Sequence, residues 1–214
     1  MIARTVLLAG AALALSGCIT LLPESEGSAL YRLTNHVTGE AGAAASPDAP
    51  VVRVTRPVAP RALSGDRVAL DTGEGRLAYM AGANWVSAAP VLVQELVIDA
   101  FDRRSSELVA VRSDDGVASS WDLRLELRRF EAVYDQGSAA APRVDVTVRA
   151  RLIDGTNREV SSVRTFEVSR RADANRQPRI VDAFSRATSE LSGELVDWAS
   201  ARVVQAEAGR SAGD

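Results

Sequence analysis

Residues 121–135 read WDLRLELRRFEAVYD, and residues 143–154 read RVDVTVRARLID. In both stretches aliphatic side chains alternate with charged or polar ones, which is the two-residue period of a strand with one buried and one wet face. The phase of the first strand shifts at Arg129 and Phe130, as a β-bulge would require. Residues 135–142 form a loop, so we expect an antiparallel pair with opposite charges facing each other on its outer side.

Shorter segments on both sides of this pair have strand-like patterns. Further strands are expected at residues 29–33, 51–55, 67–70, 76–80, 108–111 and 160–168. Gly73-Glu74-Gly75 lies between two of them, and its glycines suit a hairpin turn. Asp114-Asp115-Gly116 predicts a second turn, in which the aspartates bond to nearby backbone groups.

Two segments have apolar residues at three- and four-residue spacing, the period of an amphipathic helix. The first has a stripe that begins at Trp85, with Ser87 as N-cap and Pro90 in the first turn. The second spans residues 180–203. Each stripe either packs on the sheet or lines an apolar ligand groove. The order of elements predicts the α/β class: a single compact domain in which a mixed, largely antiparallel sheet packs with two helices.

The amino-terminal residues have the features of a lipoprotein signal peptide. Arg4 supplies a positive charge, and the apolar run at residues 5–15 is shorter than the ~20 residues of a membrane-spanning helix. Ser16 and Gly17 are the small residues that a bacterial lipobox has before its cysteine. An ordinary signal peptide and a buried helix are the alternatives. We predict that Cys18 becomes the lipidated first residue of the mature chain.

The lipobox divides the chain into four expected regions. They are a signal peptide at residues 1–17, a lipidated tether at 18–28, a folded domain at 29–204 and a disordered tail at 205–214. Lipid on Cys18 would anchor the chain to a membrane surface, outside the cytoplasm, without spanning the bilayer. Ile19 stands where an aspartate commonly favours inner-membrane retention, which predicts an outer-membrane protein that faces the periplasm.

Composition argues against several classes of function. The 214 residues carry 25 basic side chains, all arginine, and 28 acidic ones, so a net charge of −3 gives no basic footprint for nucleic acid. With one cysteine and one histidine, His36, we predict no metal site and no cofactor. The chain has no Gly-x-Ser-x-Gly motif, and Gly73-Glu74-Gly75 lacks the lysine of a P-loop. We therefore predict no catalytic residues and no enzymatic activity.

Three arginine pairs are candidates for recognising anions. They are Arg103-Arg104, Arg128-Arg129 and Arg170-Arg171. They could engage lipid phosphates or an acidic partner. The competing interpretation is a solvated surface on which each arginine pairs with a nearby carboxylate. Exposed loops at residues 39–50 and 135–142 are the expected partner-binding surfaces.

Several motifs follow one another in a distinctive order along the chain. After the lipobox come Tyr31-Arg32-Leu33, the segment VVRVTRPVAPRAL at residues 51–63, Asp66-Arg67, Trp85, the strand LRLELRRFEAVYD and Leu195-Val196-Asp197-Trp198. Over residues 30–203 this order resembles the ABC-type transport auxiliary lipoprotein family, which includes the paraquat-inducible protein C type.

The resemblance implies a non-catalytic auxiliary component of an ABC-type, mammalian-cell-entry-type system that moves lipids or hydrophobic compounds and supports envelope integrity. Its implied partners are a permease, an ATPase and a mammalian-cell-entry-domain protein. Some members form a ring, so a homo-oligomer is left open. The alternative function is a periplasmic carrier lipoprotein that binds lipid itself, which would need an apolar cavity of roughly several hundred Å³.

Overall fold

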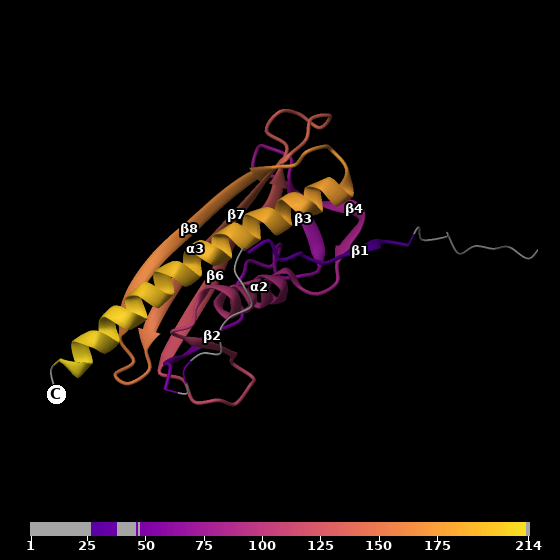
Figure 1. The fold of residues 1–214 in the computed structure, drawn as a ribbon. Coiled ribbons are helices and arrows are strands. Elements are labelled where there is room, and N and C mark those ends of the chain that lie inside the picture. The colour runs from indigo at the N-terminus through magenta and orange to yellow at the C-terminus, as the bar shows by residue number, and fades with distance from the viewer. Residues whose placement is uncertain (1–26, 38–45, 47, 213–214) are drawn as a thin grey trace, which may run out of the picture.

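A computed structural model describes residues 27–37, 46 and 48–212 (Figure 1). Within these residues the strands are β1 (Ala29–Tyr31), β2 (Val51–Val54), β3 (Arg67–Asp71), β4 (Leu77–Trp85), β5 (Val109–Arg112), β6 (Trp121–Val133), β7 (Arg143–Asp154) and β8 (Val160–Arg171). The helices are α2 (Ala89–Arg104) and α3 (Gln177–Ser211). This order confirms the predicted succession of four strands, a helix, four strands and a helix.

Strand β6 is the centre of one mixed sheet. Along one edge it pairs with β7, which in turn pairs with β8, and both pairings are antiparallel. Along the other edge it pairs in parallel with β2 near Leu123 and with β3 near Ala132, and Val58 bridges to Glu126 between them. β5 extends the sheet beyond β2, while β4 and β1 extend it beyond β3. Because the long pairings are antiparallel, the predicted mixed, largely antiparallel sheet is confirmed.

Both helices cover the same face of the sheet (Figure 1). α3 lies along β6, β7 and β8, while α2 packs against α3, β2 and β5. The alternating aliphatic residues of β6 and β7 point towards the helices and are buried. Burial of apolar surface, at about 25 cal/mol per Å², is the main favourable contribution to folding. Apart from Asp154, which pairs with Arg210 of α3, the charged residues of the same strands lie on the opposite face.

An aromatic cluster joins β4, β6 and α3. The ring centroid of Trp85 lies 5.7 Å from that of Phe130 and 5.2 Å from that of Phe184, in the tilted and edge-on arrangements that aromatic pairs prefer. Phe184 belongs to the apolar stripe of α3, and Leu191 and Leu195 of the same stripe are also fully buried. The stripe therefore packs in the core, as the first of its two interpretations predicted.

The predicted bulge in β6 is present. The pairing with β7 shifts register between Leu127 and Arg129. Leu127 and Phe130 are both buried although they are three positions apart, which strict alternation would not allow. The bulge thus keeps the apolar side chains of both halves of β6 on the face that the helices cover.

The expected start of the first helix is wrong. Trp85 is the last residue of β4, where its backbone N–H donates to the carbonyl of Asp66 at 2.6 Å. This contact with a remote segment continues the strand past the point where the apolar spacing suggested a helix. The N-cap of α2 is Ala88 and not Ser87, whereas Pro90 does lie in the first turn.

The last helix is longer than expected. Residues 205–211 are helical and do not belong to a disordered tail. The indole Nε1–H of Trp121 donates to Glu207 at 2.8 Å, and Arg210 pairs with Asp154 at 3.2 Å. These contacts with the start of β6 and the end of β7 hold the final turns of α3 against the sheet.

Candidate functional site

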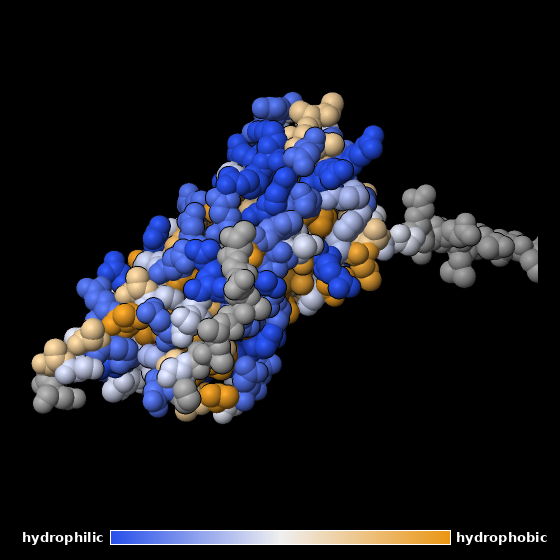
Figure 2. Space-filling model, viewed as in Figure 1, coloured by the Kyte–Doolittle hydropathy of each residue, from blue (hydrophilic) through white to orange (hydrophobic). Residues whose placement is uncertain are grey.

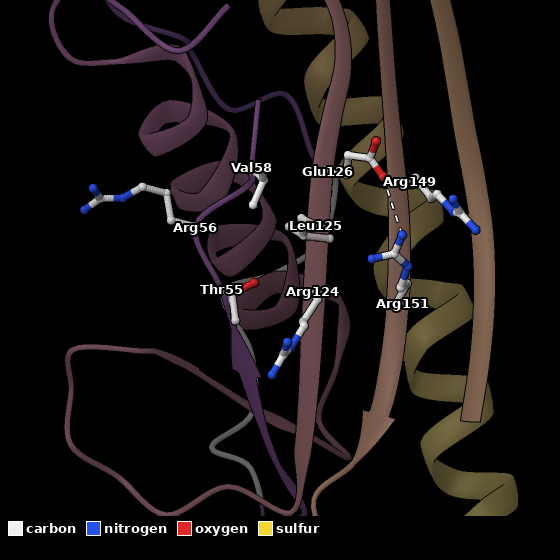
Figure 3. Close-up of a pocket in the computed structure, with 8 residues that line it drawn as sticks. All are labelled: Thr55, Arg56, Val58, Arg124, Leu125, Glu126, Arg149 and Arg151. Atoms are coloured by element: carbon white, nitrogen blue, oxygen red, sulfur yellow. Dashed lines mark ion pairs between the residues drawn. The ribbon is translucent and has the colours of Figure 1, made fainter. Parts of the chain in front are cut away.

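A groove on the sheet face away from the helices is lined by four arginines, of which three, Arg124, Arg149 and Arg151, belong to the sheet (Figure 3). It has a volume of about 440 Å³. Arg124 comes from β6, and the other two come from β7. Glu126 supplies the carboxylate of the lining, with an oxygen 3.8 Å from a guanidinium nitrogen of Arg151. We call this hollow the arginine groove.

The chain segment that follows β2 forms one side of the arginine groove. The backbone N–H of Val58 donates to the carbonyl of Leu125 at 2.9 Å, and its carbonyl accepts from the N–H of Leu127 at 2.8 Å. Two backbone bonds thus fix the position of Val58, whose side chain is 72% exposed. Arg56 also lines the groove, but its guanidinium extends away from the other three arginines (Figure 3).

The strand register explains why these arginines occupy neighbouring positions on one face of the sheet. Arg124 lies directly opposite Arg151, and Glu126 lies opposite Arg149. The expected match of opposite charges across this pair is therefore wrong at Arg124, where like charges in facing positions destabilise the sheet. Glu126 is shared between Arg151 and Arg128. Arg124 and Arg149 form no ion pair with any residue that the structure describes, so the groove has an excess of positive charge.

Most arginines of the three predicted pairs are neutralised. The ion pairs are Arg104–Asp197 at 2.6 Å, Arg128–Glu126 at 3.2 Å, Arg129–Glu131 at 3.1 Å, Arg171–Asp135 at 2.8 Å, and Arg170–Glu190. The solvated, paired interpretation is confirmed for these five. Sequence reasoning missed the arginine groove because its arginines come from two strands that are separate in the sequence. The available signal was their alternation with aliphatic residues, which places them on the outer face of the sheet.

An ion-pair network occupies the other end of this face. Asp145 accepts hydrogen bonds from Arg143 at 2.7 Å and Ser169 at 2.8 Å, and Arg129 lies 3.6 Å away. Burial raises the pKa of Asp145, but these hydrogen bonds and positive charges outweigh it, so the pKa lies below its ordinary value. Glu131 faces Asp145 across the strands, a second like-charged pair, and burial raises the pKa of Glu131.

Asp145→Asn should destabilise the fold in a pH-dependent way. Because the folded pKa of Asp145 is lowered, its stabilisation is present above the ordinary pKa of about 3.9 and is lost as pH falls through the folded pKa. We expect the variant to lose about 1.5–3 kcal/mol of unfolding free energy at pH 7, and the difference from wild type to shrink in acid. Urea melts followed by tryptophan fluorescence at pH 7 and pH 3 measure both values.

The matched control for this prediction is Asp173→Asn. Asp173 is an exposed carboxylate that pairs with Arg186 at 3.3 Å, so its loss should change the unfolding free energy by less than about 1 kcal/mol. An Asp145→Asn effect that is equal at both pH values would contradict the role given to the charge of Asp145.

The loop between β6 and β7, residues 135–142, is tied down at its base and exposed at its tip. Asp135 accepts hydrogen bonds from Arg143 and Arg171, each at 2.8 Å, and Arg171 also donates to the carbonyl of Ala141 at 2.8 Å. The hydrogen bond from Arg171 is the main reason why the pKa of Asp135 is lowered. The tip lies at the upper, largely hydrophilic end of the molecule (Figures 1 and 2). Most of the second predicted loop, residues 39–50, lies outside the described residues.

His36 lies beside α3, partly exposed. Its backbone N–H donates to Ser189 Oγ at 2.9 Å, and its Nε2 lies 3.7 Å from a carboxylate oxygen of Asp182.

In the described ranges, no group of three or more His, Cys, Asp and Glu side chains is placed to hold a metal ion. Among the residues that the structure describes, no helix is long and apolar enough to cross a membrane. Cys18 and the rest of the lipobox lie outside the described residues.

Hollows on the helix side are also lined by charged groups. One beside α3, with a volume of about 390 Å³, is bordered by Arg104, Arg170, Glu190 and Asp197. On this side hydrophobic atoms are scattered among hydrophilic ones (Figure 2). These hollows differ from the enclosed apolar cavity that the lipid-carrier alternative requires.

Two solved structures share this fold. A protein from Xanthomonas campestris, assigned to the family DUF330, matches with a TM-score of 0.74 and 24% identity over 84% of this chain and 99% of that one. A second, uncharacterised protein matches with a TM-score of 0.63 and 13% identity over 80% of this chain and 97% of its own. At these identities the likeness shows the fold alone.

Sequence comparisons add a relative and a family. An uncharacterised protein of Bradyrhizobium diazoefficiens is 29% identical over 114 residues, which are 53% of this chain and 30% of that protein. This chain therefore matches less than a third of that relative's length. The family model of the ABC-type transport auxiliary lipoprotein component matches residues 31–196, from β1 into α3. The chain belongs to the ABC-type transport auxiliary lipoprotein family.

Proposed function

We propose that this protein is a non-catalytic auxiliary component of an ABC-type transport system, anchored by lipid to the outer membrane and facing the periplasm. Family membership over residues 31–196 is the observation that carries the proposal. Its partners are a permease, an ATPase and a mammalian-cell-entry-domain protein. The cargo of the system is a lipid or another hydrophobic compound, and its transport supports envelope integrity.

Two carboxylates of the domain, Asp135 and Asp145, have a structural use, whereas burial raises the pKa of Glu131. A general base that works near neutral pH needs a pKa close to 7. Asp135 and Asp145 are held by arginines, and the pKa of each is shifted away from that value, below its ordinary range. Their ion pairs link β6, β7 and β8, which is a structural use of the charges.

The expected tether supports the anchoring. Residues 18–28 lie between the predicted lipid and β1, and eleven residues of extended chain reach roughly 35–40 Å. The domain would stay within that distance of the membrane, which raises its effective concentration beside other envelope proteins without a high intrinsic affinity.

The tip of the β6–β7 loop, residues 136–139, is the surface that we assign to the partner. It is exposed, and Asp135 anchors the base of the loop to Arg143 and Arg171. A variant without residues 136–139 keeps these ion-pairing residues. It should lose the partner while its melting temperature stays close to that of wild type.

Co-purification from native membranes tests this function. The full chain carries a carboxy-terminal tag, and membranes are dissolved in a mild non-ionic detergent. We expect the permease, the ATPase and the mammalian-cell-entry-domain protein to co-purify with wild type and to be reduced with the tip-deleted variant. The size of the purified assembly also reports whether the chain forms a homo-oligomer. Recovery of stoichiometric phospholipid and of no transporter subunit would overturn the proposal in favour of a lipid carrier.

The carrier alternative has weaker support. A lipid carrier would bury acyl chains in an apolar cavity. The stripe of α3 that would line such a cavity includes Phe184, Leu191 and Leu195, and all three are already fully buried in the core.

A further inference from the structure

We propose that the arginine groove binds the phosphate group of an anionic phospholipid, with the exposed valines beside it in contact with the glycerol and acyl part. The inference rests on the proposed function, because a lipid-anchored transport component works next to membranes. The juxtaposition that suggests it is Arg124 facing Arg151 across two strands, with Val58 and Val163 on either side.

The charge of the groove favours an anion. Arg124 and Arg151 occupy directly opposite positions, an arrangement that costs stability in a sheet. Glu126 lies 3.8 Å from Arg151 but is shared with Arg128, and it faces Arg149 in the strand register. An added anion would relieve the repulsion. Phosphate suits the site because a guanidinium group can donate two parallel hydrogen bonds to its oxygens.

The spacing of the strands lets arginines from both of them reach one ligand. Neighbouring strands lie about 4.8 Å apart, and the side chains of facing residues leave the sheet on the same side. One phosphate group above β6 and β7 can therefore be reached by flexible arginine side chains from both strands. Arg124 and Arg151 are both accessible to solvent, and Arg151 is 44% exposed.

Exposed valines beside the arginines favour a phospholipid over other anions. Val58, at the side of the groove, is 72% exposed, and Val163, which faces Arg151 from β8, is 45% exposed. Val160, farther along β8, is 55% exposed. Neither free phosphate nor an acidic peptide requires aliphatic side chains in these positions. A phospholipid carries a phosphate next to hydrocarbon. This surface places arginines next to exposed valines, so it is complementary to both parts.

Native mass spectrometry of the full lipidated chain in non-ionic detergent tests the inference. The added probes are dioleoylphosphatidylglycerol, dioleoylglycerol without a phosphate, inorganic phosphate, and a peptide of aspartate and glutamate. We expect phosphatidylglycerol to bind, and its occupancy to fall at least about tenfold in Arg124→Gln/Arg151→Gln, because charge-assisted hydrogen bonds are lost. The matched control is Arg61→Gln/Arg179→Gln, which removes two exposed arginines outside the groove and should bind as wild type does.

A second variant tests the apolar part of the site. Val58→Ser/Val163→Ser should weaken phosphatidylglycerol binding while its melting temperature stays close to that of wild type, because both side chains are exposed. The arginine double variant should melt at the same temperature as wild type or higher, since it removes a like-charged pair. These two variants keep the inference testable even if one of them folds poorly.

The other outcomes overturn the inference. Binding of inorganic phosphate without phosphatidylglycerol would make the groove a free-phosphate site, and binding of the acidic peptide alone would make it a protein-docking surface. Equal binding of dioleoylglycerol, or unchanged phosphatidylglycerol binding in Arg124→Gln/Arg151→Gln, would show that the arginines do not contribute to lipid binding. Since the experiment contains no transporter subunit, its failure is separate from failure of the proposed function.

Discussion

Leu191→Asp is expected to unfold the domain. Leu191 lies on the inner stripe of α3 and is fully buried in the hydrophobic core. The substitution forfeits the packing of a leucine side chain, about 2–5 kcal/mol, and brings in a carboxylate without a partner. The combined cost is comparable with the whole stability of a typical domain, about 5–15 kcal/mol.

The measurement is a urea melt followed by fluorescence of the three tryptophans. All three, Trp85, Trp121 and Trp198, are buried and will report the loss of packing. The matched control is Val204→Asp, which introduces the same carboxylate on the same helix at a side chain that is 40% exposed. We expect the control to change the unfolding free energy by less than about 1 kcal/mol. If Leu191→Asp melts as cooperatively as the control, the assignment of the core is wrong.

Cys18→Ser is expected to abolish the lipid-anchored mature form of the protein almost completely. In the lipobox interpretation the sulfur of Cys18 carries the lipid, and the peptidase cuts only before a cysteine that can be modified. Buried acyl chains contribute about 0.8 kcal/mol per methylene, so their loss removes the anchor. Fractionation should therefore find the variant in the soluble fraction, or as an uncut precursor that is longer by residues 1–17.

Ser16→Ala is the control for this experiment, because it keeps a small residue two positions before the cysteine. It should be cut and lipidated as wild type is. Mass spectrometry of the mature amino terminus measures both the cut and the added lipid. A processed Cys18→Ser chain that still sediments with membranes would contradict lipid anchoring through Cys18.

The local patterns predicted the centre of the fold well. Alternation placed Leu123 and Val146 inside and Arg124 and Arg151 outside, because strand side chains point to the two faces in turn. The phase shift at Arg129 also predicted the bulge. Both properties depend on neighbours along the chain, which is why sequence alone could give them.

Properties that depend on remote segments were not predictable in this way. Trp85 remains in a strand because Asp66 accepts its backbone N–H, and the end of α3 is held by the hydrogen bond between Trp121 and Glu207. The facing positions of Arg124 and Arg151 depend on the exact pairing register of two strands, which is set by the loop and the bulge together. Insertion or deletion of one residue in the loop or the bulge would shift the register, and Arg124 and Arg151 would no longer face each other.

Photo-crosslinking in living cells tests the central claim most directly. A photoreactive amino acid replaces Ser138 at the tip of the β6–β7 loop, and in a second strain it replaces the exposed Arg202 on α3. We expect light-dependent products from position 138 that contain the mammalian-cell-entry-domain protein or the permease, and few or none from position 202. Correctly anchored protein that gives no transporter subunit from either position would contradict a role as an auxiliary component that works by binding its transporter.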